Sequence, residues 1–309
     1  MDIQIDNLSK RYGPQKAVDQ LSFQVKTGEI LGFLGPNGAG KSTTMKMITG
    51  YIGIGDGEIK IGDKSVREHG DELKRHIGYL PENNPLYLEM PVIDYLRFCA
   101  DLQGVPKNKT DERIRLMIRM CGLNAEKHKK IGELSKGYRQ RVGLAQAMIH
   151  DPEILILDEP TTGLDPNQIV EIRKLIRELG KEKTVILSTH ILPEVEATCD
   201  RILIINKGKI VANGTAETLR KQATGQEILK LRIEDGTAEQ ILHELRRMST
   251  VDLVELMDRN LNRFELQSRT GATSKREIFK LCVQKGWVLT ELIPIETRLE
   301  DIFRDLTTN

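Results

Sequence analysis

Gly35-Pro36-Asn37-Gly38-Ala39-Gly40-Lys41-Ser42-Thr43 is the stretch that decides the fold. It matches the pattern G-x-x-x-x-G-K-[ST] at every fixed position. Residues 29–34 predict a short buried strand running into it, and residues 43–48 predict the helix leaving it. A glycine-rich turn could match the pattern by chance. A strand, a loop and a helix in this order instead favour a phosphate-binding loop.

The chemistry of this loop is set by its small residues and its lysine. Small side chains let backbone N–H groups close around a polyphosphate, and the N-terminus of the following helix adds partial positive charge. We expect Lys41 to reach the β and γ phosphates and the Ser42 hydroxyl to bind Mg²⁺. The loop therefore predicts nucleotide binding but does not specify the reaction.

The composition indicates a globular protein of about two domains. The chain has 309 residues, of which 39% are hydrophobic and 29% charged, so it can bury a core. A net charge of +1 gives no electrostatic argument for nucleic acid or an anionic membrane as partner. No apolar run approaches the roughly 20 residues that span a bilayer, and residues 1–5 do not resemble a signal peptide. A membrane role would therefore need a partner.

The cysteines predict no covalent framework. Cys99, Cys121, Cys199 and Cys282 lie far apart in the sequence and form no C-x-x-C pair. This spacing is typical of reduced thiols in a cytosolic protein rather than of disulfides or a zinc site.

A second stretch with chemical character follows a predicted core strand at residues 154–157. The strand ends in Asp158 and Glu159, and Pro160 follows. Ligands gather at the carboxyl ends of strands in an open α/β sheet, so both acids are expected near the phosphate loop. Asp158 can bind Mg²⁺, and Glu159 can orient or deprotonate a water in line with the γ phosphate. The proline and the phosphate loop argue against two acids that merely cap a helix.

For three further residues, the residue pattern alone leaves two interpretations open. His190 ends a predicted core strand, residues 184–190, so it could contact the γ phosphate or be structural. Tyr12 lies at a predicted turn and could stack on a base or be a half-buried turn residue. Ser135 suits the N-cap of a helix that runs to about residue 148, and the loop before that helix could hold an anion.

The order of predicted elements divides the chain near residues 218–224, which gives domains 1–221 and 222–309. The first contains antiparallel strands, the phosphate loop and a helical insertion at about residues 83–150. The second follows the order βαββαβ, which suggests a small ferredoxin-like α+β module. It carries no recognisable chemical constellation. Dimer contact, stability, regulation and partner docking all stay open as its role.

Together these stretches resemble the ATP-binding subunit of an ABC transporter over about residues 1–220. The resemblance implies an α/β fold with a P-loop NTPase (RecA-like) core, an antiparallel β subdomain and a helical insertion. The matching stretches are residues 35–43 (Walker A), 134–141 (the LSGGQ signature, here LSKGYRQR), 154–159 (Walker B with its catalytic glutamate), 163–166 (the D-loop), His190 (the switch histidine) and Tyr12 (the aromatic that stacks on adenine).

The resemblance also implies a site for ATP and Mg²⁺. Glu159 and His190 would be catalytic. Ser42, Asp158 and Glu82 would bind the metal. The residues expected to contact ATP are Tyr12, Gly35, Pro36, Asn37, Gly38, Ala39, Gly40, Lys41, Ser42, Thr43, Glu82, Asp158, Ser135, Gly137 and Asp165.

The family further implies partners. Each ATP would be held between the Walker motifs of one subunit and the signature of a second subunit, identical or paralogous. Ser135 and Gly137 would face the γ phosphate bound by that second chain. ATP binding would close this head-to-tail dimer and hydrolysis would reopen it, which drives transmembrane permease subunits. The chain would lie peripherally on the cytoplasmic face of the membrane, and no nucleic acid is expected.

Two positions depart from the family pattern. Glu82 stands where the Q-loop usually has glutamine and adds a charge beside the triphosphate. Lys136 replaces a small signature residue and adds positive charge near the phosphate. The Pro-Glu variant, the single ATPase domain and the C-terminal extension resemble ABC-2 type exporters. Residues 83–87 and 132–141 resemble the gliding-motility-associated branch of these exporters.

Two rival functions use the same core. An ATP switch that remodels nucleic acid or ribosomes is disfavoured because the chain has no second cassette and no basic excess. A non-catalytic interaction module is disfavoured by the intact Lys41, Asp158, Glu159 and His190.

Overall fold

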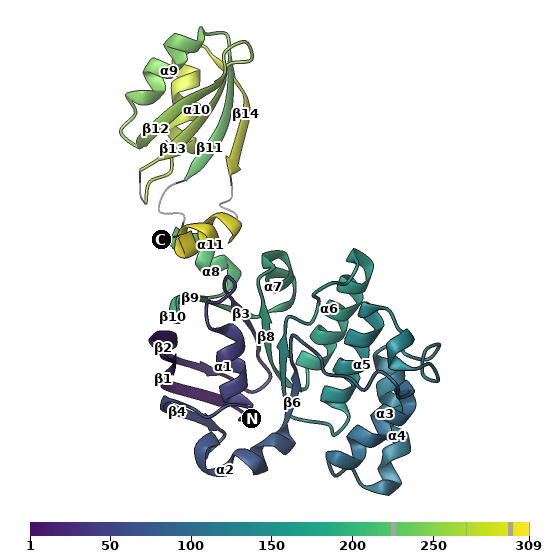
Figure 1. Ribbon diagram of the computed structural model, residues 1–309. Helices are drawn as coiled ribbons and strands as arrows, with labels where there is room; N and C mark the ends of the chain where they lie inside the picture. Colours follow the sequence, from purple (N-terminus) through teal and green to yellow (C-terminus); the bar gives the residue numbers. More distant parts are fainter. Residues whose placement is uncertain (224–226, 270, 296–298, 309) are drawn as a thin grey trace. The chain divides into compact units, whose positions relative to one another are not determined.

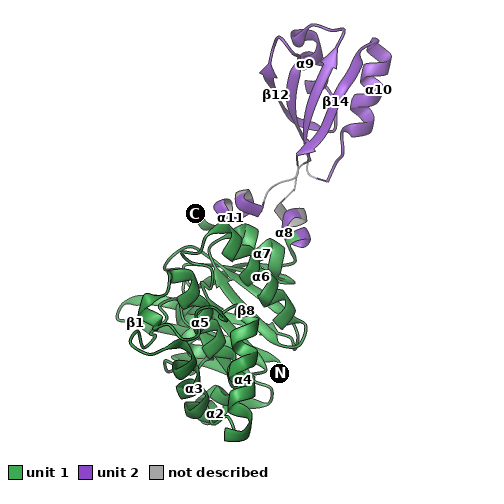
Figure 2. Cartoon of the chain, turned by 90° about the vertical axis from the view of Figure 1, so that its right-hand side faces the viewer, with its two compact units in different colours: residues 1–216, 306–309 green, residues 217–305 purple. Residues whose placement is uncertain are grey.

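The protein is described here from a computed structural model (Figure 1). The described residues are 1–223, 227–269, 271–295 and 299–308. The chain forms two compact units, shown in different colours in Figure 2. Unit 1 comprises Met1–Ala216 together with the end of the chain from Leu306, and unit 2 comprises Glu217–Asp305. The division predicted after residue 221 falls inside helix α8, Ala216–Ala223.

The centre of unit 1 is a six-stranded sheet in the order β10-β9-β3-β8-β7-β6. Neighbouring strands are parallel, except that β10 runs antiparallel to β9. The carboxyl ends of the five parallel strands therefore meet at one edge of the sheet. The strands are β3 (Ile30–Leu34), β6 (Ile77–Leu80), β7 (Ile154–Asp158), β8 (Thr184–Thr189), β9 (Arg201–Asn206) and β10 (Lys209–Gly214).

The central strands are buried on both faces because helices or a second sheet cover each side. Ile154 and Ile156 of β7 face the same core cluster as the phosphate-loop helix. Leu155 and Leu157 face the opposite cluster, beneath the helical insertion. This period-two division explains why the sequence shows a continuous apolar run rather than an alternating one.

One face of the central sheet is covered by the helix that follows the phosphate loop, α1 (Lys41–Ile48). Met45, Met47 and Ile48 of this helix are fully buried between the central sheet and a four-stranded antiparallel sheet. That second sheet has the order β2-β1-β4-β5. Its strands are β1 (Ile3–Tyr12), β2 (Gln15–Val25), β4 (Asp56–Ile61) and β5 (Lys64–Ser65).

The other face is covered by helices, most of them from the insertion (Figure 1). Val92, Tyr95, Leu96 and Cys99 of the predicted helical insertion are all buried there, at the spacing of one helix face. The helices are α3 (Val92–Leu102), α4 (Lys107–Met120), the 3₁₀ turn η2 (Ile131–Glu133), α5 (Lys136–Met148), α6 (Pro166–Gly180) and α7 (Leu192–Thr198). Two short elements before β6, α2 (Val66–Leu73) and the 3₁₀ turn η1 (Lys74–His76), complete this unit.

Unit 2 contains a four-stranded antiparallel sheet in the order β12-β13-β11-β14. Two of its helices, α9 and α10, share one core cluster with the sheet, so both lie on the same face. The elements follow the predicted order βαββαβ: β11 (Ile228–Glu234), α9 (Ala238–Arg246), β12 (Val251–Asp258), β13 (Arg263–Ser268), α10 (Lys275–Lys285) and β14 (Val288–Ile295). Order and pairing together are those of a ferredoxin-like module.

The chain closes with α11 (Leu299–Thr308). Asn206 Nδ2 of β9 donates a hydrogen bond to the Leu306 carbonyl at 3.2 Å, which ties the end of the chain to unit 1. Within the described ranges, no helix is both long enough and apolar enough to cross a membrane. All four cysteines carry free thiols, as their spacing predicts.

Candidate active site

The phosphate loop connects the end of β3 to the first residue of α1. Gly40 is the N-cap of α1 and has φ of 108°, a left-handed conformation that favours glycine. A Cβ at this position would lie 2.3 Å from the Ala17 carbonyl oxygen, so only glycine fits. The loop can therefore turn sharply and present the helix N-terminus to an anion.

Lys41 is the first residue of α1, and only 6% of it is exposed. Its Nζ donates to the carbonyl oxygens of Gly35 at 2.8 Å and Pro36 at 3.3 Å. The same atom lies 3.7 Å from Glu159 Oε1. These contacts fix the ammonium group over the loop, between the loop backbone and the acid at the end of β7.

Asp158 is the last residue of β7 and is buried. Its Oδ1 atom has no hydrogen-bond partner among the described residues. A buried carboxylate oxygen without a partner costs free energy unless something binds it. Oxygen donors are what Mg²⁺ requires, so this orphan atom fits a metal at the sheet edge.

The other expected metal ligands, Ser42 and Glu82, line a cleft that is also lined by Glu159, the residue after Asp158. Glu82 is exposed. Within the described ranges, no group of three or more histidine, cysteine or acidic side chains is arranged to hold a metal. Mg²⁺ at phosphate sites usually binds one or two carboxylates and takes its remaining ligands from phosphates and water. The set of one hydroxyl and two carboxylates therefore suits a metal that arrives with its nucleotide.

Glu159 directly follows β7 and has φ of 51°, an uncommon conformation for a residue with a side chain. Its backbone N–H donates to the Ser188 carbonyl of β8 at 2.9 Å. This hydrogen bond holds the strained turn against the neighbouring strand. The turn aims the nearly buried carboxylate at the loop instead of continuing the strand.

His190 follows the end of β8, the strand next to β7. Its Nδ1 lies 2.9 Å from Glu159 Oε2, and its side chain is 50% exposed. The structure thus places the histidine at the predicted sheet edge, against the acid rather than in the core.

Lys41, Ser42, Glu82, Glu159 and His190 line one cleft of about 610 Å³. Tyr12 lies at its rim and is 52% exposed. Three lining residues were not singled out by the sequence pattern: Gln15, Ala17 and Thr162. Only their neighbours in the sequence, Tyr12 and Glu159, could have pointed to them. The cleft is lined by Tyr12, Gln15, Ala17, Asn37, Gly38, Gly40, Lys41, Ser42, Thr43, Glu82, Glu159, Thr162 and His190.

Seven expected ATP contacts do not line this cleft. Gly35, Pro36 and Ala39 belong to the phosphate loop, and Asp158 directly precedes the lining residue Glu159. The other three are Ser135, Gly137 and Asp165. They lie together at the N-termini of α5 and α6. Asp165 caps α6 in a capping box with Gln168, and a Cβ on Gly137 would lie 2.3 Å from Gln168 Oε1. Ser135 caps α5, as predicted, by accepting a hydrogen bond from the Tyr138 N–H. One chain therefore carries two separate groups of the expected ATP contacts.

Lys136 belongs to the second group. A Cβ on Gly163 would lie 2.4 Å from Lys136 Nζ, so the lysine side chain packs over this glycine of its own chain. Gly163 has φ of 77°, and its lack of a side chain leaves room for the ammonium group. The signature helix and the loop before α6 are thus in direct contact.

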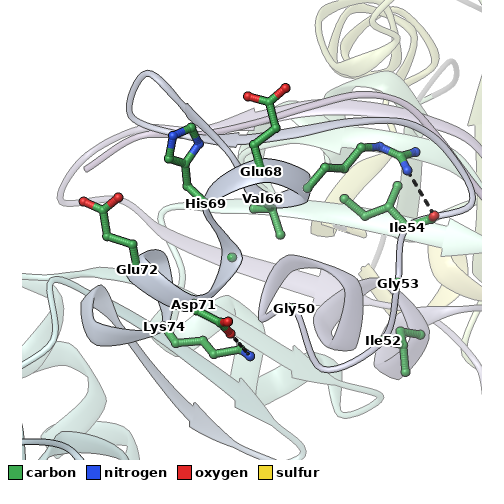
Figure 3. Close-up of a pocket in the computed structure, with 12 residues that line it drawn as sticks. Gly50, Ile52, Gly53, Ile54, Val66, Glu68, His69, Asp71, Glu72 and Lys74 are labelled. Atoms are coloured by element: carbon green, nitrogen blue, oxygen red, sulfur yellow. Dashed lines mark hydrogen bonds and ion pairs between the residues drawn. The ribbon is translucent and has the colours of Figure 1, made fainter.

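A second hollow, of about 550 Å³, lies between α2 and the segment at residues 50–54 (Figure 3). Arg67 donates to the Ile54 carbonyl at 3.3 Å, and Lys74 pairs with Asp71 at 2.7 Å. Arg67 and Lys74 are thus already bound to neighbouring groups of the protein. No residue of the phosphate loop lines this hollow. We do not assign the nucleotide to it.

Comparisons with known proteins agree with this geometry. The family model described as "ABC transporter" matches residues 18–162. The bacitracin transport ATP-binding protein BcrA of Bacillus licheniformis is 36% identical, covering 97% of this chain and 95% of that protein. The linearmycin resistance ATP-binding protein LnrL of Bacillus subtilis is 33% identical, covering 99% and 98%. A solved structure titled "Structure of ATP binding subunit of ABC transporter" is 32% identical, with a TM-score of 0.66, covering 72% and 93%.

Proposed function

The chain belongs to the ABC transporter ATP-binding family, and from this premise we propose how its own residues bind and hydrolyse ATP. It is the ATPase subunit that powers a membrane exporter. We assign the binding and catalytic roles to these residues because the phosphate loop, Glu159 and His190 line one cleft.

ATP binds with its phosphates on the loop of residues 35–43. Backbone N–H groups and the N-terminus of α1 hold the phosphate oxygens, and Lys41 adds a full positive charge. Tyr12 at the cleft rim stacks on the adenine ring. Ser42, Asp158 and Glu82 would hold Mg²⁺, which when bound would neutralise charge on the transferred phosphoryl group.

Glu159 is the residue that activates water. Its carboxylate lies at the carboxyl end of β7, faces the loop and can accept a proton from a water in line with the γ phosphate. His190 donates to Glu159 or to a phosphate oxygen, and Lys41 Nζ lies 3.7 Å from the same acid. The imidazole N–H and the lysine ammonium group stabilise the charge that develops in the transition state.

A complete site requires two chains. The residues at the N-termini of α5 and α6 lie outside the cleft of their own chain. The same residues of a second chain can contact ATP only if that chain turns this surface toward the first chain's phosphate loop. Two chains related by a twofold axis then form two equal sites, each with Ser135, Gly137 and Asp165 from the partner chain. Closure on ATP and reopening after hydrolysis move the permease subunits.

The names of two relatives support a role in export. One carries bacitracin transport in its name and the other linearmycin resistance, and both are covered over nearly their full length. The subunit therefore works at the cytoplasmic face of a membrane beside a multi-span permease. The gliding-motility-associated branch stays a prediction.

Affinity purification from membranes in mild detergent tests this function. The tagged chain should retain a multi-span membrane protein in fixed ratio, identified by mass spectrometry, and a Lys41→Ala chain should retain it equally. Ribosomal or DNA-binding partners in its place would overturn the transporter role and leave the ATPase chemistry intact.

A further inference from the structure

Glu194 is a buried acid that the proposed reaction does not use. It lies in α7, the short helix after His190, and is only 3% exposed. An acid is almost never buried to this degree unless it is paired or hydrogen-bonded. No basic side chain pairs with it in the described part of the chain; its partners are two threonine hydroxyls.

The two hydroxyls belong to the two loops that carry the reacting groups. Thr161 Oγ1, two residues after Glu159, donates to Glu194 Oε2 at 2.7 Å. Thr189 Oγ1, immediately before His190, donates to the same oxygen at 3.3 Å. A single carboxyl oxygen therefore joins the turn after β7 to the turn after β8.

Thr189 is itself fixed in a second way. Its Oγ1 accepts a hydrogen bond from the Ile191 N–H at 3.1 Å. The hydroxyl is thus engaged as donor to Glu194 and as acceptor from the turn that contains His190. Rotation of either threonine side chain would break at least one of these hydrogen bonds.

We propose that Glu194 is a positioning residue that sets the distance between Glu159 and His190 by clamping Thr161 and Thr189. The inference rests on the catalytic roles proposed above for those two residues. Glu194 does not touch the cleft, so it acts only through the loops it holds.

The surroundings of Glu194 disfavour its charged form. Burial raises the pKa of Glu194, the two threonine hydrogen bonds oppose that rise, and the nearby charge of Glu159 adds to it. Its other oxygen, Oε1, has no partner among the described residues. The clamp needs one accepting oxygen and no charge, so an amide at this position can do the same.

Substitutions that remove or keep the accepting oxygen test the proposal in the full chain. Glu194→Ala should lower kcat for ATP hydrolysis about 10- to 100-fold, because small displacements of reacting groups have effects of this size. The KM for ATP should change by less than about threefold, because the phosphate loop belongs to β3 and α1. Glu194→Gln keeps an accepting oxygen and should restore kcat to near that of the natural chain.

A matched control lies on the same helix. Thr198 is buried in α7, and its Oγ1 has no partner among the described residues. Thr198→Val should leave kcat unchanged, whereas Thr161→Val and Thr189→Val should each lower it. If Glu194→Ala does not fold, Thr161→Val and Thr189→Val still test the proposal. Equal effects of all three valine substitutions would overturn the clamp.

Hydrogen exchange gives a readout independent of turnover. In Glu194→Ala, amide exchange should rise in residues 159–165 and 188–191 and stay unchanged in the phosphate loop. Unchanged exchange in both turns would refute the clamp even if activity fell. Raised exchange with unchanged kcat would instead show that the turns are clamped but that the roles proposed for Glu159 and His190 are wrong.

Discussion

His190 Nδ1 lies 2.9 Å from Glu159 Oε2 and 3.0 Å from Oε1. The two residues follow neighbouring parallel strands, β8 and β7, so their turns meet at the same sheet edge. Lys41 Nζ approaches the same carboxylate at 3.7 Å. Lys41 lies 118 residues before Glu159 in sequence, and His190 lies 31 residues after it. The three segments converge on one acid because the strands that precede them are parallel neighbours in the sheet.

The first prediction concerns the acid itself. Glu159→Gln keeps the size of the side chain and its hydrogen bonding but removes the charge that accepts a proton. Hydrolysis should fall about 1,000-fold, within the range general base catalysis supplies. ATP binding should persist, because the loop and Lys41 are untouched, and the dimer should stay closed. Phosphate release and equilibrium ATP binding measure the two effects separately.

The control for this variant is Glu182→Gln, an exposed glutamate in the turn before β8. It should behave as the natural chain in both assays. Hydrolysis by Glu159→Gln at more than a tenth of the natural rate would contradict the assignment, because the remaining groups would then suffice.

The second prediction concerns the cleft rim. Tyr12→Ala should weaken ATP binding by about 1–3 kcal/mol, the range for loss of one base stack. Tyr12→Phe keeps the ring and should bind ATP normally, since stacking does not need the hydroxyl. Tyr51, another strongly exposed tyrosine outside the cleft, supplies the control Tyr51→Ala. Titration with ATP and with inorganic triphosphate separates base from phosphate contacts. Equal loss for both ligands would exclude stacking.

The phosphate loop and the two acids could be predicted from the sequence because their chemistry is local. The loop pattern fixes residue types at adjacent positions, and Asp158 and Glu159 directly follow an apolar run. The hairpin between β9 and β10 is also set by adjacent residues, since Lys207 and Gly208 both have the positive φ of a tight hairpin turn.

The helices α2 and α7 were not predicted. Each has eight residues or fewer, too short for a clear hydrophobic period, and α7 has Pro193 in its first turn. Glu194 could not have been identified for the same reason. Its partners, Thr161 and Thr189, lie 33 and 5 residues away and meet it only because β7 pairs with β8.

The third prediction tests whether one site is shared by two chains. Lys41→Ala removes a charge that contacts phosphate and should weaken ATP binding about 10- to 100-fold. Ser135→Asp keeps a favoured N-cap residue but places negative charge toward the partner's γ phosphate, so it should abolish hydrolysis. Each variant alone should be inactive as a homodimer.

Mixing the two variants should restore activity. In the mixed dimer, one site has the natural Lys41 from one chain and the natural Ser135 from the other. Random pairing of equal amounts should return about a quarter of the natural rate if both chains are identical in the native dimer. A chain that carries both substitutions, mixed with the Lys41→Ala chain, forms no intact site and serves as the control. No restoration would contradict a shared site.

The fourth prediction concerns an arginine that joins β9 to β2 and to the residue before β3. Arg201 at the start of β9 pairs with Glu29 at 2.5 Å and donates to the Gln24 carbonyl at 2.6 Å. Arg201→Ala should lower the free energy of unfolding by about 2 kcal/mol, since it leaves a mostly buried acid without its partner. Arg259→Ala, which breaks an exposed pair with Glu239, should cost less than about 0.5 kcal/mol.

The effect of Arg201→Ala should depend on pH in a defined direction. Burial alone would raise the pKa of Glu29, but hydrogen bonds from Arg201 and the Lys26 N–H, with the arginine charge, hold it below its usual 4.5. An acid with a lowered pKa in the folded state stabilises the protein above its unfolded pKa and loses that contribution as pH falls through the folded value. The difference in unfolding free energy between natural chain and variant should therefore be constant above about pH 5.5 and shrink below pH 4.5. Urea unfolding at several pH values measures it, and a difference that grows on acidification would show that the pair does not stabilise the charged form of Glu29.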